Sequence, residues 1–208
     1  MKNIVILISG RGSNMQAIVN AGIPDVRIAA VLSNSATAAG LAWAAERGIP
    51  TDSLNHKDFA SRGAFDQAMM EKIDAYQPDL VVLAGFMRIL TPEFCTRYEG
   101  RLMNIHPSIL PSFTGLHTHE RALAAGCRVA GCTIHFVTSE LDCGPIISQG
   151  VVPIFDNDTA DGIAARVLKV EHRLFPQAVA DFAAGRLKIE GNRVINSRNQ
   201  PEDRPLLA

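Results

Sequence analysis

The chain has 208 residues, of which 47% are apolar and 20% charged, and its formal net charge is −1. This is the composition of an ordinary globular domain, and it excludes a charge-driven attraction to nucleic acid or to membrane surfaces. The N-terminus lacks the pattern of a signal peptide, and no apolar run approaches the roughly 20 residues that span a bilayer. The four cysteines have no metal-type spacing, which favours reduced thiols. We therefore predict a cytoplasmic protein without nucleic-acid or membrane partners.

Short β-branched runs alternate with helical patterns along the first hundred residues. Apolar residues at Phe65, Met69, Ile73 and Tyr76 are three or four positions apart, which predicts a helix with one buried face. Another helix begins at Thr91-Pro92-Glu93, an N-cap residue followed by a first-turn proline and acid. We predict further helices at 15–20 and 38–47 and strands at 3–9, 27–33, 51–54 and 80–84. This alternation predicts an α/β fold with a doubly wound, mostly parallel central sheet and helices on both faces.

The second half has longer connections between its elements. We predict strands at 102–106, 130–137 and 146–152, a short helix at 119–125 and a small hairpin at 188–195. A long helix is expected from about 159 to 184, bent or broken at Pro176 because proline cannot donate a backbone hydrogen bond. Together these elements predict one domain over 1–195, with a phosphate-binding half at 1–100 and a second half at 101–195. Residues 196–208 are predicted to be a loose tail.

A glycine-rich turn, Ser-Gly-Arg-Gly-Ser-Asn, follows the first predicted strand and opens a helix. Glycine at Gly12 lets the backbone turn closely around a ligand, and the free amides of the helix N-terminus favour an anion. Ser13 and Asn14 add polar side chains at the same place. The turn therefore suits a phosphate monoester, although it lacks the third glycine of the dinucleotide fingerprint and the lysine of a P-loop. A plain tight turn is the alternative interpretation.

Asn104 and His106 lie two apart at the end of a predicted strand, so both side chains point to one side. They would converge at the carboxyl edge of the sheet, where α/β proteins bind ligands. Asp142 lies in a turn between two predicted strands, and a carboxylate near an imidazole favours its charged form. A cationic histidine beside an amide can stabilise an oxyanion, which suits acyl transfer to an amine. The alternative is that Asn104 and His106 only cap a strand end.

Five segments in this order resemble the phosphoribosylglycinamide formyltransferase family, the folate-dependent formyltransferases of purine biosynthesis. They are ISGRGSN at 8–14, VLAGFMRIL at 82–90, NIHPSILP at 104–111, GLHTH at 115–119 and LDCGPII at 141–147. The resemblance runs from residue 3 to about 190 and implies a Rossmann-like formyltransferase fold. It implies transfer of the formyl group of 10-formyltetrahydrofolate, as co-substrate, to the primary amine of N1-(5-phospho-D-ribosyl)glycinamide. It also implies small-molecule substrates, no metal, and a monomer or homodimer.

The resemblance assigns roles to individual residues of this chain. It implies a catalytic trio of Asn104, His106 and Asp142, in which Asp142 favours the protonated imidazole and Asn104 helps to hold the formyl oxygen. The implied acceptor-binding residues are Gly12, Ser13, Asn14, Leu168, Lys169, Val170 and Glu171. The implied folate-binding residues are Arg62, Met87, Arg88, Ile89, Leu90, Asn104, Thr138, Ser139, Glu140, Leu141 and Asp142. Cys143 departs from the family, which usually has glycine there, and its side chain could change the folate loop.

Other functions are open from the same residues. A formyltetrahydrofolate hydrolase would share the Asn, His and Asp but carry an N-terminal regulatory domain, which we do not expect here. A transferase acting on initiator tRNA would need a basic C-terminal extension. A non-catalytic nucleotide-binding module would use only the glycine loop. His117 and His119 are a weak signal for zinc, because no cysteine pair supports them. His135 reads as a hydrogen-bonded core histidine.

Overall fold

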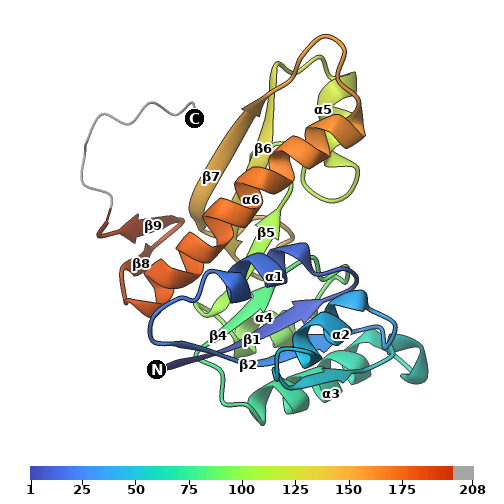
Figure 1. Cartoon of the computed structure of the whole chain (residues 1–208), viewed down its shortest axis with the longest axis vertical. Coiled ribbons are helices and arrows are strands. Elements are labelled where there is room, and N and C mark those ends of the chain that lie inside the picture. The colour runs from blue at the N-terminus through green and yellow to red at the C-terminus, as the bar shows by residue number, and fades with distance from the viewer. Residues whose placement is uncertain (199–208) are drawn as a thin grey trace.

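The computed structural model describes residues 1–198 and forms one nine-stranded sheet with helices on both faces (Figure 1). The strand order is β3-β2-β1-β4-β5-β6-β7-β9-β8. The strands are β1 Lys2–Ile8, β2 Val26–Ser33, β3 Thr51–Ser53, β4 Leu80–Leu83, β5 Leu102–His106, β6 Val129–Phe136, β7 Ile146–Pro153, β8 Leu187–Glu190 and β9 Arg193–Asn196. The helices are α1 Ser13–Asn20, α2 Ala39–Ala45, η1 His56–Asp58, α3 Arg62–Asp74, α4 Pro92–Arg97, α5 Thr118–Ala124 and α6 Ala160–Ala183.

The first five strands are parallel, and β6 and β7 continue the sheet in antiparallel pairs. The chain leaves β1 toward β2 and β3 and then returns on the other side of β1 to form β4. This reversal places a topological switch point between the carboxyl ends of β1 and β4, which is where open α/β sheets bind ligands. The predicted α/β fold with a mostly parallel sheet is confirmed.

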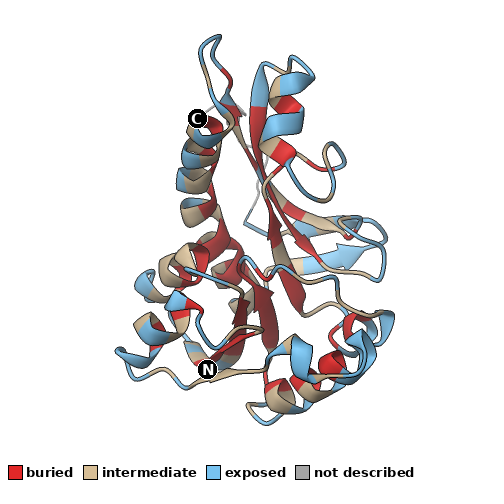
Figure 2. Ribbon diagram, turned by 90° about the vertical axis from the view of Figure 1, so that its right-hand side faces the viewer, coloured by how far each residue is buried: buried red, intermediate tan, exposed pale blue. Residues whose placement is uncertain are grey.

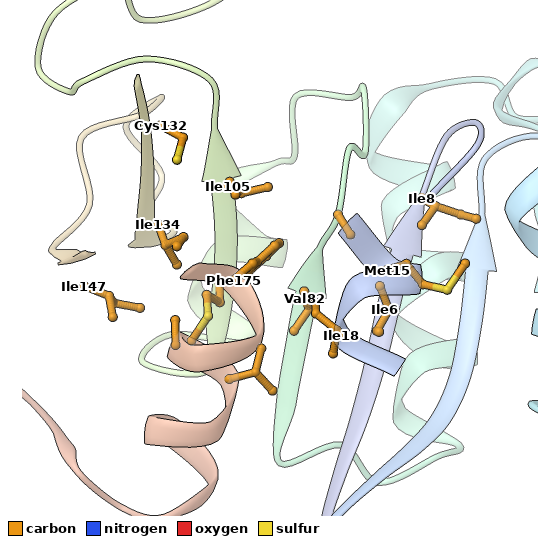
Figure 3. Packing of buried hydrophobic residues seen from close by; sticks show 14 of the residues in the cluster. Ile6, Ile8, Met15, Ile18, Val82, Ile105, Cys132, Ile134, Ile147 and Phe175 are labelled. Carbon is orange, nitrogen blue, oxygen red and sulfur yellow. The ribbon is translucent and has the colours of Figure 1, made fainter. Parts of the chain in front are cut away.

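Both faces of the sheet are buried because alternate residues of each central strand point to opposite sides. In β1, Ile4, Ile6 and Ile8 pack with α1 and α6, whereas Val5 and Leu7 pack with α3 and α4. Figure 3 shows Met15 and Ile18 of α1 over Ile6 and Val82, and Phe175 of α6 beside Ile134. In Figure 2 the strands are mostly buried while the outer sides of the helices are exposed.

Local sequence signals account for the helix ends. Thr91 caps α4 by accepting a hydrogen bond from the Phe94 amide at 3.3 Å, and Pro92 occupies the first turn. The predicted break at Pro176 is wrong, because α6 continues through this residue. Pro176 is buried with Phe175 in the face of α6 that packs on the molecule, and this packing offsets the hydrogen bond that proline cannot make.

The other predicted elements are present with ends shifted by one or two residues, including the terminal hairpin of β8 and β9. β9 extends to Asn196, so the first residue of the predicted tail belongs to a strand. The rest of that prediction falls mainly on 199–208, which lie outside the described residues. Within residues 1–198, no helix combines the length and apolar character needed to cross a membrane.

Candidate active site

The glycine loop after β1 adopts the open turn that its sequence predicts. Gly12 has φ 68°, a left-handed conformation that glycine adopts readily, and it precedes α1 as the N-cap residue. Among the described residues no side chain caps this helix, so its first amides remain available to a ligand. A cavity of about 280 Å³ opens here. Its lining comprises Ser9, Gly10, Arg11, Gly12, Ser13, Asn14, Ala84, Gly85 and Met87.

Ser9 joins the glycine loop to the segment after β4. Its hydroxyl donates to Asn34 Oδ1 at 2.6 Å and accepts from the Met87 amide at 2.8 Å. The Ser9 amide also donates to the Gly85 carbonyl at 3.2 Å. Because these bonds connect the ends of β1, β2 and β4, they fix the two walls of the cavity relative to one another.

Glu171 of α6 contacts Asn14, which follows the glycine turn. Asn14 Nδ2 donates to Glu171 Oε2 at 2.7 Å, and the two residues are 8% and 6% exposed. Burial raises the pKa of Glu171, while the hydrogen bond from Asn14 and the charge of His106 oppose that rise. Asn14 Oδ1 is buried without a partner among residues 1–198. An unpaired buried acceptor beside a buried carboxylate is unfavourable, and a polar ligand can satisfy both.

His106 lies at the end of β5 with both ring nitrogens facing acceptor oxygens. Nε2 is 2.9 Å from the Phe113 carbonyl, and Nδ1 is 3.5 Å from Asp142 Oδ2. A carbonyl can only accept, so Nε2 carries the proton of this bond. The neutral ring would then turn a lone pair toward the carboxylate, whereas the imidazolium presents a proton to each acceptor. Asp142, whose side chain is only 7% exposed, can therefore form an ion pair with His106 when the imidazole is protonated.

Asn104 is oriented by His135 of the adjacent strand. His135 Nδ1 donates to the Phe136 carbonyl at 2.9 Å, so its Nε2 is the acceptor for Asn104 Nδ2 at 3.2 Å. Burial lowers the pKa of His135 and favours this neutral form. The bond uses one of the two N–H groups of Asn104, and the second has no hydrogen-bond partner within residues 1–198.

The segment after β4 presents apolar side chains to solvent. Met87 is 67% exposed and Ile89 59%, and exposed apolar groups of this kind mark ligand grooves as well as protein contacts. Arg88 lies 5.0 Å from the centre of the Phe65 ring. The segment is tied to α3 because Asp66 Oδ2 accepts from the Thr91 amide at 2.7 Å. Burial raises the pKa of Asp66.

The remaining predicted folate-binding residues lie at the start of α3 and in the loop after β6. Arg62 begins α3, and its charge lowers the pKa of Asp66 against the larger effect of burial. Residues 138–142 form a largely exposed loop, in which Thr138 Oγ1 donates to the Glu140 carbonyl at 3.2 Å. Asp142 has φ 56°, and Cys143 is not among the described residues with positive φ. The cysteine therefore introduces no left-handed strain, and its side chain is exposed.

The segment 168–171 does not face one direction, because successive helical residues point about 100° apart. Glu171 reaches Asn14, whereas Val170 packs toward β7 at Gly150. Leu168 is half-buried and Lys169 is exposed. Within residues 1–198, no three His, Cys, Asp or Glu side chains gather as metal ligands would.

The sequence model of the formyl transferase family matches residues 2–179. The chain belongs to the formyl transferase family. It is 51% identical over 193 residues to the phosphoribosylglycinamide formyltransferase of Escherichia coli K12, covering 91% of each chain. It matches the structure of glycinamide ribonucleotide transformylase 1 from Symbiobacterium toebii with a TM-score of 0.91, 46% identity and 94% of each chain covered. It also matches the structure of phosphoribosylglycinamide formyltransferase from Brucella melitensis, with a TM-score of 0.83 and 53% identity. This match covers 88% of this chain and 96% of that chain.

The predicted resemblance and the predicted enzyme class are thus confirmed, and the chain is a formyltransferase. The family's co-substrate is 10-formyltetrahydrofolate, as predicted. Sequence reasoning missed several supports of this formyltransferase's candidate site. The turn motif does not reveal that Ser9 bonds the segment after β4, and His135, which is buried and hydrogen-bonded as predicted, also orients Asn104. The register between β5 and β6 would identify His135 as a partner of Asn104, because the two residues lie directly opposite one another.

Proposed function

We propose that this formyltransferase transfers the formyl group of 10-formyltetrahydrofolate to the primary amine of glycinamide ribonucleotide in de novo purine biosynthesis, giving the N-formyl product and tetrahydrofolate. The observation that carries the proposal is the pairing of His106 with Asp142 beside the free N–H of Asn104. The charge of His106 lowers the pKa of Glu171 against the larger effect of burial. Glu171 in turn accepts a hydrogen bond from Asn14 of the glycine loop. These two contacts support a single site that holds both the proposed catalytic and the proposed acceptor-binding groups.

In the proposed mechanism, the acceptor amine attacks the formyl carbon directly. A carbon–nitrogen bond forms to the acceptor, the bond from the formyl carbon to folate N10 breaks, and N10 gains a proton to replace the one the amine loses. The tetrahedral oxygen becomes negative on the way. The Nδ1 atom of His106 is 3.5 Å from Asp142 Oδ2, which is longer than a tight hydrogen bond, and we assign a proton to it. It can therefore also serve the oxyanion, together with the second N–H of Asn104.

On the acceptor side, we assign the phosphate to the amides of Gly12, Ser13 and Asn14. Glu171 would accept hydrogen bonds from the ribose hydroxyls, as the buried partner of Asn14. Leu168, Lys169 and Val170 complete this proposed side as neighbours of Glu171 on α6. This division keeps the phosphate on the half at 1–100 and the reacting groups on the half at 101–195 of a single domain over 1–195.

On the folate side, we assign the flat pterin ring to the apolar segment after β4 and to the loop at 138–142. Exposed Met87, Ile89 and Leu141 suit such a ring, because burying their apolar surface against it is favourable. Arg62 and Arg88 would meet the carboxylates of the folate tail. The assigned folate residues are Arg62, Met87, Arg88, Ile89, Leu90, Asn104, Thr138, Ser139, Glu140, Leu141 and Asp142. A cytoplasmic location and a monomeric or homodimeric state stay predictions.

The test incubates pure protein with 10-formyltetrahydrofolate in the presence and absence of glycinamide ribonucleotide. Turnover that requires the amine supports the proposal, and turnover without it would instead indicate a hydrolase. No turnover under either condition would refute the proposal and favour a passive nucleotide-binding protein or the tRNA enzyme.

Two variants test the roles of the catalytic pair. His106→Ala and Asp142→Asn should each lower kcat by roughly 100-fold or more, the loss typical of an oxyanion donor or its support, while both substrates still bind. Asp156→Asn is the matched control, because Asp156 is exposed and pairs only with Arg128 among the described residues. Near-normal kcat in either catalytic variant would remove that residue from the mechanism. Ser13→Asp should weaken acceptor binding by like-charge repulsion, and unchanged affinity would place the phosphate elsewhere.

A further inference from the structure

The loop at 113–117 has an unusual backbone. Three of its five residues have left-handed φ angles, 57° at Phe113, 76° at Gly115 and 56° at His117. Glycine adopts this conformation readily, but side-chain-bearing residues do so rarely and at a cost in free energy. A loop with two such residues keeps its shape only where the surrounding contacts hold it there.

This shape is what brings the loop to both members of the catalytic pair. The Phe113 carbonyl accepts from His106 Nε2 at 2.9 Å. Two residues later, the Gly115 amide donates to Asp142 Oδ2 at 2.9 Å. The same carboxylate oxygen lies 3.5 Å from His106 Nδ1. The loop therefore orients the imidazole and the carboxylate at once, and a change in its backbone would move both.

The contacts that hold the loop come from Arg121 in the last turn of α5. Its Nη1 donates to the Thr114 carbonyl at 2.5 Å and to the Leu116 carbonyl at 3.3 Å. The same guanidinium lies 5.4 Å from the centre of the Phe113 ring. One side chain thus contacts Phe113 and Thr114 before Gly115 and Leu116 after it. A planar guanidinium suits this task because it can bond carbonyls along its edge while its face lies on an aromatic ring.

We propose that Arg121 is a positioning residue that sets the geometry of His106 and Asp142 through the loop at 113–117. It touches neither catalytic side chain and acts through the Phe113 carbonyl and the Gly115 amide. This proposal rests on the proposed function, since it assigns Arg121 a part in the same reaction.

The experiment compares Arg121→Met and Arg121→Lys with wild type and with a control, Arg128→Met. Arg128 is also an exposed arginine of the same region, but its partner is Asp156 and not the catalytic loop. Arg121→Met should lower kcat by roughly 10- to 100-fold, the range expected when reacting groups are misplaced by up to about 1 Å. KM for both substrates should stay within about threefold, because the substrate contacts are intact. Arg121→Lys keeps the positive charge and one donor nitrogen, so it should recover part of the lost kcat.

Hydrogen exchange of the Gly115 amide gives a readout that does not depend on turnover. Loss of the Arg121 contacts should loosen the loop, so this amide should exchange faster in Arg121→Met than in wild type or Arg128→Met, with Tm nearly unchanged. Unchanged kcat and unchanged exchange would overturn the proposal, and so would an equal loss in the control or a loss confined to KM. If wild type itself transfers no formyl group, the proposed function fails. Faster exchange at Gly115 in Arg121→Met would still show that Arg121 holds the loop at 113–117.

Discussion

Thr133 of β6 is the centre of a buried hydrogen-bond network that holds the loop after His106. Its hydroxyl donates to the Ser108 carbonyl at 2.7 Å and accepts from the Leu110 amide at 3.0 Å. Gln149 Nε2 lies 3.0 Å from the same oxygen and also bonds the Leu110 carbonyl at 2.8 Å. Thr133 is completely buried. Replacing it with the isosteric valine therefore removes the hydroxyl without creating a cavity.

The cost of Thr133→Val follows from the groups that it leaves unpaired. The Leu110 amide and the Ser108 carbonyl both lose this partner, while Gln149 is exposed and can turn to water. An unsatisfied buried polar group costs about 1–3 kcal/mol, so two of them should lower the free energy of unfolding by about 2–6 kcal/mol. For a chain of this size such a loss lowers Tm by on the order of 10 °C. Because the loop carries the Phe113 carbonyl, kcat should fall as well.

Urea unfolding followed by circular dichroism measures the loss of stability, and Thr118→Val is the matched control. The Thr118 hydroxyl is also buried, but among the described residues it makes a single bond, to the Pro107 carbonyl at 2.7 Å. Thr133→Val should therefore cost roughly twice as much as Thr118→Val. A cost below about 1 kcal/mol for Thr133→Val, or equal costs for the two variants, would show that the network does not hold the loop.

Two further predictions concern buried ionisable groups. Burial raises the pKa of Glu171 above 4.5, so its contribution to stability is present below pH 4.5 and is lost as pH rises through the folded-state pKa. Glu171→Gln should therefore gain stability relative to wild type between pH 5 and 7.5 while acceptor affinity falls roughly tenfold, and an unchanged acceptor affinity by calorimetry would refute the role of Glu171. Burial lowers the pKa of His135 below 6.5, so its contribution is present above pH 6.5 and is lost as pH falls through the folded-state pKa. The stability advantage of wild type over His135→Gln should shrink from pH 7.5 to 5.5, and urea midpoints that keep a constant difference would contradict this.

The parallel half of the fold could be predicted because its signals are local. Fully apolar runs such as β4 and the spacing of Phe65, Met69 and Ile73 each require only a few neighbouring residues to be recognised. Pro176 misled the prediction because proline normally disrupts a helix interior. The packing that keeps α6 intact comes from the sheet beneath Phe175 and Ala178, and no local pattern reports it.

The proposed reacting groups could be named from the sequence, but the groups that orient them could not. Asn104, His106 and Asp142 belong to recognisable motifs, whereas the orientation of Asn104 depends on His135, 31 residues away. The Phe113 carbonyl and the Gly115 amide are backbone groups, so no residue type at these positions identifies their partners. Their roles depend on the left-handed φ angles of the loop, which bring these two groups to His106 and Asp142.

The change from parallel to antiparallel pairing at β6 is what gives the site its supports. Because β6 runs back along β5, His135 lies opposite Asn104 and Thr133 lies opposite His106. His135 orients the Asn104 amide. Thr133 bonds the Ser108 carbonyl and so holds the loop that returns to the His106 imidazole. β7 pairs antiparallel with β6 and packs against α6, the helix from which Glu171 contacts Asn14.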